Sequence, residues 1–242
     1  DKSIATDDAN SSTNDYVFTR RMAVQRGIIN LKAGKNVKAI LSTTDLSKIG
    51  ETSVVGLSMN SSSHATSNAE AGINLEANTT VTADRTTAGN GAVGLYMNYG
   101  KVNTDASSII NVEKETSNSA NDSAVGIYSV NGSEVTNEGT VDVSGDKGIG
   151  ILGYASGEHL DKYGTDKKIT DGTLTAADKL LEIENKGNIT VAGKDGIGIY
   201  AELNNPSGSS LITRANGLVK NSGKITALGD KGLTVVASDK TT

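Results

Sequence analysis

Three glutamates are outward residues of a repeated strand pattern, so that two or three carboxylates could lie one coil apart, an arrangement that acid–base chemistry could use. Glu134 opens the copy Glu-Val-Thr-Asn, while Glu182 and Glu184 flank Ile183 in a later copy. Two carboxylates held close together can share a proton or bind a calcium ion. The alternative is a solvated charged face on which Lys220 offsets Glu184. We expect the charged face, because no aromatic residue adjoins the glutamates to stack on a sugar ring.

The remaining residue types give little support to nucleophilic catalysis or metal binding. The chain has no cysteine, and its two histidines, His64 and His159, lie in polar segments between the repeated patterns. A histidine without a fixed carboxylate neighbour does not hold the tautomer that a general base needs. No group of histidines or cysteines has metal-ligand spacing. We therefore expect no catalytic residue, no metal site, no cofactor and no enzymatic activity.

One outward position of the repeat carries the chemistry of a binding surface. It contains three of the seven tyrosines of the chain and two aliphatic residues, in the row Ser58, Tyr96, Tyr128, Leu152, Tyr200 and Val236. An exposed stripe of tyrosine and aliphatic side chains is typical of surfaces that bind a partner. We predict that Tyr96, Tyr128 and Tyr200 contact such a partner. The alternative is that an inserted loop folds back and covers the row.

A second candidate binding element is the long insertion over residues 157–178, whose composition differs abruptly from the flanking patterns. Long loops on a rigid scaffold often carry binding residues, and an aromatic ring among lysines supplies contacts that interfaces use. The residues predicted to bind are His159, Lys162, Tyr163, Lys167 and Lys168. The alternative is an insertion without a binding role, because solenoids tolerate loops that contact nothing.

The elements that must hold these residues are short recurring patterns in which apolar residues alternate with polar or small ones. The first pattern occurs at 53–58, 92–96, 124–128, 148–152 and 196–200, with a degenerate copy at 232–236. The second, with an Asn-x-Gly turn between two apolar pairs, occurs at 135–143, 183–191 and 219–227. Turns of the type Gly-Asp-Lys-Gly or Gly-Lys-Asp-Gly link the second pattern to the next copy of the first. The alternation has the period of a half-buried strand.

Three short strands and three turns per copy predict an all-β fold, a right-handed parallel β-helix of about six coils plus a partial one. We expect the first pattern to form two interior aliphatic ladders, with its glycines pointing outward. The ladder residues are Val55/Leu57, Val93/Leu95, Val125/Ile127, Ile149/Ile151, Ile197/Ile199 and Leu233/Val235. Asn137, Asn185 and Asn221 are expected to form a structural ladder whose side chains bond neighbouring backbone.

The chain divides into a polar beginning and a repetitive remainder. Residues 1–20, rich in Asp, Asn, Ser and Thr, are too polar to predict a coil, and we expect only partial order there. Residues 21–242 form the β-helix section, with insertions expected at 58–70, 113–122, 153–180 and 201–216. Since no polar capping repeat closes this section, we expect it to belong to a longer filament.

Composition restricts both the core and the partners. Only 3% of the residues are aromatic while 36% are hydrophobic, so the core must be built from small aliphatic side chains. A net charge of -5 and a pI near 5.1 argue against nucleic acid and against an anionic membrane surface, which attract clustered lysine and arginine. No apolar run reaches the length of a membrane-spanning helix.

The Gly-Ile-Gly-Ile-Tyr strand, the Asn-x-Gly turn, the Ile-x-Val strand and the Gly-Asp-Lys-Gly turn recur in this order. Together they resemble the passenger domains of type V autotransporters, most of all the large outer-membrane adhesins of fusobacteria. The resemblance covers roughly residues 21–242. It implies a fibre at the bacterial cell surface, associated with virulence and anchored in the outer membrane only through a translocating β-barrel outside this chain.

The leading hypothesis from the sequence is therefore a cell-surface adhesin segment without enzymatic activity. Its partner would be a protein or glycan receptor on a host cell or on another bacterium. Two rival hypotheses stay open: a polysaccharide-processing β-helix enzyme, and a structural stalk whose binding region lies elsewhere.

Overall fold

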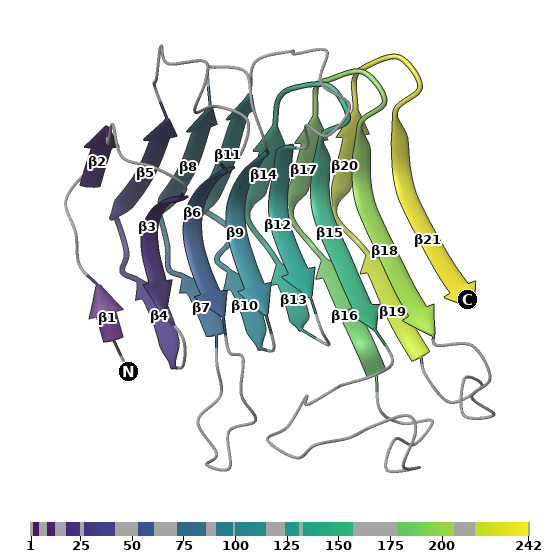
Figure 1. Cartoon of the computed structure of the whole chain (residues 1–242), viewed down its shortest axis with the longest axis horizontal. Coiled ribbons are helices and arrows are strands. Elements are labelled where there is room, and N and C mark those ends of the chain that lie inside the picture. Colours follow the sequence, from purple (N-terminus) through teal and green to yellow (C-terminus); the bar gives the residue numbers. More distant parts are fainter. Residues whose placement is uncertain are drawn as a thin grey trace.

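The computed structural model describes residues 2–4, 9–12, 18–24, 27–41, 53–60, 72–85, 91–98, 100–114, 124–130, 133–156, 179–205 and 216–241. Over these ranges the chain forms the strands β1 to β21 and no helix. The strands belong to three sheets, and each turn of the chain adds one strand to every sheet. Figure 1 shows the resulting stack of layers, with β1 at one end and β21 at the other.

The three sheets contain seven strands each. Sheet A consists of β1 (Lys2–Ile4), β4 (Ile28–Leu31), β7 (Gly72–Leu75), β10 (Lys101–Thr104), β13 (Glu134–Asn137), β16 (Lys179–Asn185) and β19 (Asn216–Asn221). Sheet B consists of β2 (Ala9–Ser12), β5 (Asn36–Leu41), β8 (Thr80–Arg85), β11 (Ile109–Lys114), β14 (Thr140–Val143), β17 (Asn188–Val191) and β20 (Lys224–Ala227). Sheet C consists of β3 (Phe18–Val24), β6 (Ser53–Asn60), β9 (Ala92–Asn98), β12 (Ala124–Val130), β15 (Ile149–Ser156), β18 (Ile197–Asn205) and β21 (Leu233–Thr241).

Every strand pair is parallel, and each strand pairs with the strands three places before and after it. This arrangement confirms the predicted all-β parallel β-helix. The repeated patterns fix the register, because equivalent residues of successive copies pair directly, as Val135 does with Ile183 and Val141 with Ile189. Residues of one pattern position therefore form continuous rows along the stack.

The core is a single aliphatic cluster to which all three sheets contribute. Ile73 of sheet A, Val81 of sheet B and Leu95 of sheet C are each completely buried. Apart from two methionines, the cluster consists of Ile, Leu, Val and Ala residues, as the low aromatic content predicts. Stacking layers buries these small side chains without the large aromatic anchors of an ordinary globular core.

The glycines of sheet C point into the core, so the outward orientation predicted from the sequence is wrong. A Cβ atom on Gly56 would lie 2.5 Å from Val81 Cγ1 and 2.6 Å from the carbonyl oxygen of Gly94. The equivalent glycines 94, 126, 150 and 198 face Ile110, Val141, Ile189 and Ile225 of sheet B in the same way. Glycine at these positions leaves room for the branched side chains of the neighbouring sheet.

Only one of the two interior ladders predicted for sheet C exists. Leu57, Leu95, Ile127, Ile151 and Ile199 are completely buried, as expected. The other ladder, Val55, Val93, Val125, Ile149 and Ile197, lies outside the core cluster. The reason is that inward and outward residues do not alternate strictly here. Each glycine points inward, and the aliphatic residue that follows it, which belongs to the confirmed ladder, also points inward. The residue before each glycine therefore lies on the outer side of the sheet, where Val55, Val93, Ile149 and Ile197 are half-buried and Val125 is only 4% exposed.

A ladder of side-chain hydrogen bonds runs along the end of sheet A. Asn137 Nδ2 donates to Asn185 Oδ1 at 2.7 Å, and Asn185 Nδ2 donates to Asn221 Oδ1 at 2.7 Å. Thr104 extends the ladder by donating its hydroxyl to Asn137 Oδ1 at 2.7 Å. Each asparagine also donates to the carbonyl oxygen two residues ahead, at Gly139, Gly187 and Gly223. The predicted structural ladder is confirmed: the bonds between layers join side chain to side chain, and the bonds to backbone stay within the turn of each asparagine.

The boundaries of the repeat differ from those expected. The segment 1–20 supplies β1, β2 and the start of β3, and β1 and β2 pair with β4 and β5. The strands also extend into the expected insertions: β6 ends at Asn60, β11 at Lys114, β15 at Ser156 and β18 at Asn205. After the two longest insertions the strands resume at Lys179, where β16 begins, and at Asn216, where β19 begins.

Candidate binding surface

The outer faces of the three sheets differ in chemistry although their backbones are alike. The central outer row of sheet A is polar: Asn30, Asn74, Asn103, Thr136, Glu184 and Lys220. The corresponding row of sheet B is also polar: Lys38, Thr82, Asn111, Asp142, Thr190 and Thr226. In sheet C the row is Ser58, Tyr96, Tyr128, Leu152, Tyr200 and Val236. The structure thus brings together the tyrosine row predicted from the sequence.

A second apolar row accompanies the tyrosine row on sheet C. It consists of Val55, Val93, Val125, Ile149, Ile197 and Leu233, which pair in register. This is the row that the inward glycines displace to the outside. We call the two rows together the apolar face. Aliphatic residues on the outer side of a sheet are unusual next to two polar faces, and apolar surface of this kind marks interaction sites.

The tyrosines of the apolar face are half-buried, and two of them, Tyr96 and Tyr128, pack against each other. The ring centroids of Tyr96 and Tyr128 lie 5.5 Å apart with the rings at 78°, an edge-to-face contact. Burial raises the pKa of the Tyr128 hydroxyl, and nearby Tyr154 raises it further. Tyr200 donates its hydroxyl to Glu202 Oε2 at 2.6 Å. Packing and hydrogen bonding restrict the rotation of these rings in the chain itself.

The five loop residues predicted to bind, His159, Lys162, Tyr163, Lys167 and Lys168, lie outside the described residues. Their role stays a prediction. The strands that flank the loop are β15 and β16.

Of the three glutamates considered for acid–base chemistry, Glu134 and Glu182 are in register, Glu184 is in register with Thr136, and none of the three lines the groove on sheet A described below. Glu134 pairs with Glu182 across adjacent strands, and Glu184 lies beside Lys220. Glu134 Oε2 lies 4.0 Å from Lys101 Nζ, and Glu184 Oε2 lies 3.4 Å from Lys186 Nζ. The arrangement matches a solvated charged face in which lysines offset the carboxylates.

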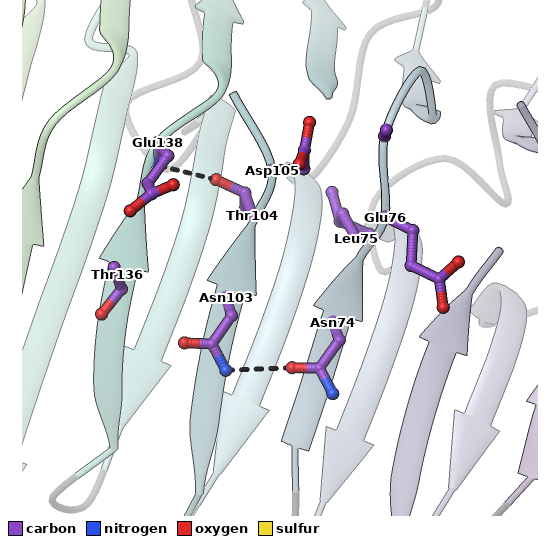
Figure 2. Close-up of a pocket in the computed structure, with 9 residues that line it drawn as sticks. Asn74, Leu75, Glu76, Asn103, Thr104, Asp105, Thr136 and Glu138 are labelled. Atoms are coloured by element: carbon purple, nitrogen blue, oxygen red, sulfur yellow. Dashed lines mark hydrogen bonds between the residues drawn. The ribbon is translucent and has the colours of Figure 1, made fainter. Parts of the chain in front are cut away.

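Sheet A carries a feature that the sequence did not reveal, an open groove of about 390 Å³ across β7, β10 and β13. Figure 2 shows Asn74, Asn103 and Thr136 along its floor, with Asn103 Nδ2 donating to Asn74 Oδ1 at 2.9 Å. The asparagines that recur at one position of β4, β7 and β10 could have indicated this polar row from the sequence. The sequence copies that contain these strands, however, match the repeated pattern only weakly.

Three carboxylates line the same groove, and each already has a partner. Glu76 accepts a hydrogen bond from Lys32 at 2.7 Å, which together with a bond from the Ala33 N–H lowers its pKa. The carboxylate of Glu138 accepts a hydrogen bond from Lys186 at 3.3 Å. Ser107 lowers the pKa of Asp105 through hydrogen bonds from its backbone N–H and its hydroxyl. The groove offers hydrogen-bonding groups suited to a polar ligand, but its acids are committed to local contacts.

The described residues contain neither a metal-binding cluster nor a membrane-spanning helix. No group of three or more His, Cys, Asp or Glu side chains is arranged to hold a metal ion there. In the same part of the chain no helix is long and apolar enough to span a membrane. Comparison of the chain with protein families, with curated proteins and with solved structures finds no match.

Proposed function

We propose that this chain is an adhesin segment, a β-helical scaffold that binds a protein or glycan receptor on another cell. The observation that carries the proposal is the apolar face, because the same backbone bears polar residues on its two other outer faces. The surface of a spacer only has to keep the protein soluble, and polar residues are sufficient for that. A stripe of aromatic and aliphatic residues on one side instead favours a surface that recognises a partner. The resemblance to autotransporter passengers supports the proposal and adds its location, the bacterial cell surface.

Tyrosine is well suited to contact such a receptor. It combines a large rigid ring with a hydroxyl, and it is enriched among the residues that dominate binding energy at interfaces. Successive strands of a sheet are about 4.8 Å apart, so a row along the stack presents closely spaced contacts to an extended partner.

The test is adhesion of beads coated with the chain to mammalian cells and to other bacteria. Replacing Tyr96 and Tyr128 together by Ser should reduce bead binding more than tenfold, about 1.4 kcal/mol. The matched control replaces Asn111 and Thr190 by Ser on the outer face of sheet B, which should leave adhesion unchanged. Thermal melting of both variants verifies that the fold is retained.

A third variant separates the two predicted binding elements. Deleting residues 157–178 and bridging the gap with Gly-Ser should weaken adhesion if the loop contributes contacts of its own. Beads coated with the parent chain that bind no better than beads coated with albumin would contradict the adhesin proposal and favour the stalk.

The polar groove of sheet A is the feature that favours the alternative function, a polysaccharide-processing enzyme. Such an enzyme would require carboxylates that exchange protons with a glycan. Glu138→Gln removes a carboxylate that lines the groove, and a second variant changes Glu134, Glu182 and Glu184, which lie on the same sheet outside the groove, to Gln; both variants remove negative charge at similar size. Depolymerisation of acidic glycans by the parent chain and its loss in either variant would replace the adhesin proposal by the enzyme.

A further inference from the structure

The groove on the outer face of sheet A lies where a row of hydrogen-bonded side chains is interrupted. Asn74 Nδ2 donates to Asn30 Oδ1 at 2.8 Å, and Asn103 Nδ2 donates to Asn74 Oδ1 at 2.9 Å. The next residue of the row is Thr136, which pairs in register with Asn103. Within the described part of the chain, neither Asn103 Oδ1 nor the Thr136 hydroxyl makes a hydrogen bond. The interruption therefore leaves two polar groups without partners on the floor of the groove, which Figure 2 shows.

The asparagines of this row also keep part of their own hydrogen-bonding capacity. A carboxamide has two N–H donors and an oxygen that accepts two hydrogen bonds. Asn74 uses one donor and one acceptor position in the row, so one of each remains. Asn103 uses a single donor. A hydroxyl group both donates and accepts, so two neighbouring hydroxyls of a sugar ring match the donor and the acceptor of one carboxamide.

The charges around the groove disfavour a negatively charged ligand. Two of its carboxylates form ion pairs with lysines: Glu76 with Lys32 at 2.7 Å, and Glu138 with Lys186 at 3.3 Å. The third, Asp105, accepts hydrogen bonds from the N–H and the hydroxyl of Ser107. Among the described residues no lysine, arginine or histidine lines the groove. An anionic ligand would therefore meet carboxylates without a facing cation, whereas a neutral ligand meets no such repulsion.

The spacing along the groove favours a glycan over an extended peptide. Neighbouring strands are about 4.8 Å apart, so the floor offers polar groups at that interval from β7 to β13. An extended peptide turns its backbone groups to one side at every second residue, about 6.6–6.8 Å apart. A peptide that adds a strand also needs a sheet edge, whereas β7, β10 and β13 are each paired on both sides. Sugar hydroxyls follow one another closely around a ring and can bond to side chains on the face of a sheet.

We propose that the groove on sheet A is a second recognition site, separate from the apolar face, and that it binds a short neutral oligosaccharide. The Asn103 carboxamide and the Thr136 hydroxyl bond to the hydroxyls of one sugar ring, and Asn74 bonds to the next ring. The groove of about 390 Å³ is large enough, since small-molecule sites occupy about 300–1,000 Å³. This site does not use the tyrosine row, so it holds whether or not the apolar face binds a receptor.

The test is an NMR titration of the nitrogen-15-labelled chain that follows the side-chain amide signals of Asn74 and Asn103. The neutral probes are lactose, mannotriose and triacetylchitotriose. Among the described residues no aromatic ring lines the groove, so binding rests on hydrogen bonds and Kd should be on the order of 1 mM for at least one probe. Two acidic probes, sialyllactose and trigalacturonate, should bind at least about threefold more weakly than the best neutral probe.

A pair of matched variants locates the site. Asn103→Ala with Thr136→Val removes the two groups without partners and should weaken binding of the best probe by about fivefold or more. The control, Asn111→Ala with Thr190→Val, makes the same changes in the central outer row of sheet B and should leave Kd unchanged. All four side chains lie on outer faces, so both variants should keep the fold, which their backbone amide signals verify.

A third variant separates this site from the apolar face. Tyr96→Ser with Tyr128→Ser should leave the Kd of the best probe unchanged, even where it abolishes adhesion to cells. Loss of sugar binding in this variant would contradict a separate site. Equal weakening by the sheet A variant and its sheet B control would likewise overturn the assignment to the groove.

The probes themselves decide the class of ligand. If no neutral sugar shifts the Asn74 and Asn103 signals at up to about 20 mM, well above a millimolar Kd, the groove is not a glycan site. Tighter binding of the acidic probes would overturn the charge argument. Larger shifts with tetra-alanine would assign the groove to a polypeptide, and new anomeric proton signals from cleaved sugar would replace binding by hydrolysis.

Discussion

The asparagine ladder makes a quantitative prediction for Asn185→Ala. Asn185 and Asn137 are completely buried, and the substitution removes the acceptor of the 2.7 Å bond from Asn137 Nδ2. A buried donor left without its partner costs about 1–3 kcal/mol, and the lost Asn185 bonds to Asn221 and Gly187 add about 1 kcal/mol. We therefore expect a destabilisation of about 2–4 kcal/mol.

The measurement is thermal melting followed by far-ultraviolet circular dichroism. For a chain of this size 1 kcal/mol shifts Tm by about 2–4 °C, so the midpoint should fall by about 5–15 °C. Asn221→Ala is the matched control. Asn221 is exposed, so water can replace the lost contact and the cost should stay below about 1 kcal/mol. Equal shifts for the two variants, or an unchanged Tm for Asn185→Ala, would refute the view that the buried ladder stabilises the stack.

Two further substitutions test the glycine column and the tyrosine row. Gly56→Ala places a methyl group 2.5 Å from Val81 Cγ1 and 2.6 Å from a backbone oxygen, and overpacking of this kind costs about 1–3 kcal/mol in urea unfolding. Gly72→Ala, whose nearest contact would be 3.3 Å, should cost clearly less, and a reversed order would show that the glycines do not face the core. Because the pKa of Tyr128 is raised in the folded state, its contribution to stability is complete below the unfolded value near 10 and falls as the pH rises above it. Tyr128→Phe should therefore reduce the loss of stability at alkaline pH. A spectrophotometric titration at 295 nm, which follows phenolate formation, should show a tyrosine whose pKa lies above the ordinary value, and its absence would contradict the raised pKa of Tyr128.

The repeated patterns were sufficient to predict the register of most of the stack. Tyr96, Tyr128 and Tyr200 share a row because equivalent positions of successive copies pair directly, and counting from the glycines places them correctly. The orientation of Val93 and Gly94 could not be predicted from alternation. Two consecutive inward residues, Gly94 and Leu95, break the period of two, and this break depends on packing against Ile110 of another sheet.

Other features were missed because they arise between layers rather than within one copy. The groove on sheet A combines Asn74, Asn103 and Thr136 from three layers, of which the first two match the repeat poorly. The first strands, β1 and β2, have a polar composition that predicts no strand. They pair nonetheless, because β4 and β5 offer the backbone donors and acceptors of an existing sheet edge.

The stacking of layers determines how the molecule responds to a pulling force along its long axis. The hydrogen bonds that join one layer to the next run along that axis, so tension loads the three strand pairs of an interface at the same time. A single strand cannot be peeled off first, because its neighbours in the same layer share the load. Rupture then requires a whole layer to separate at once, and the force that the stack withstands is set by its weakest interface rather than by the sum of all of them.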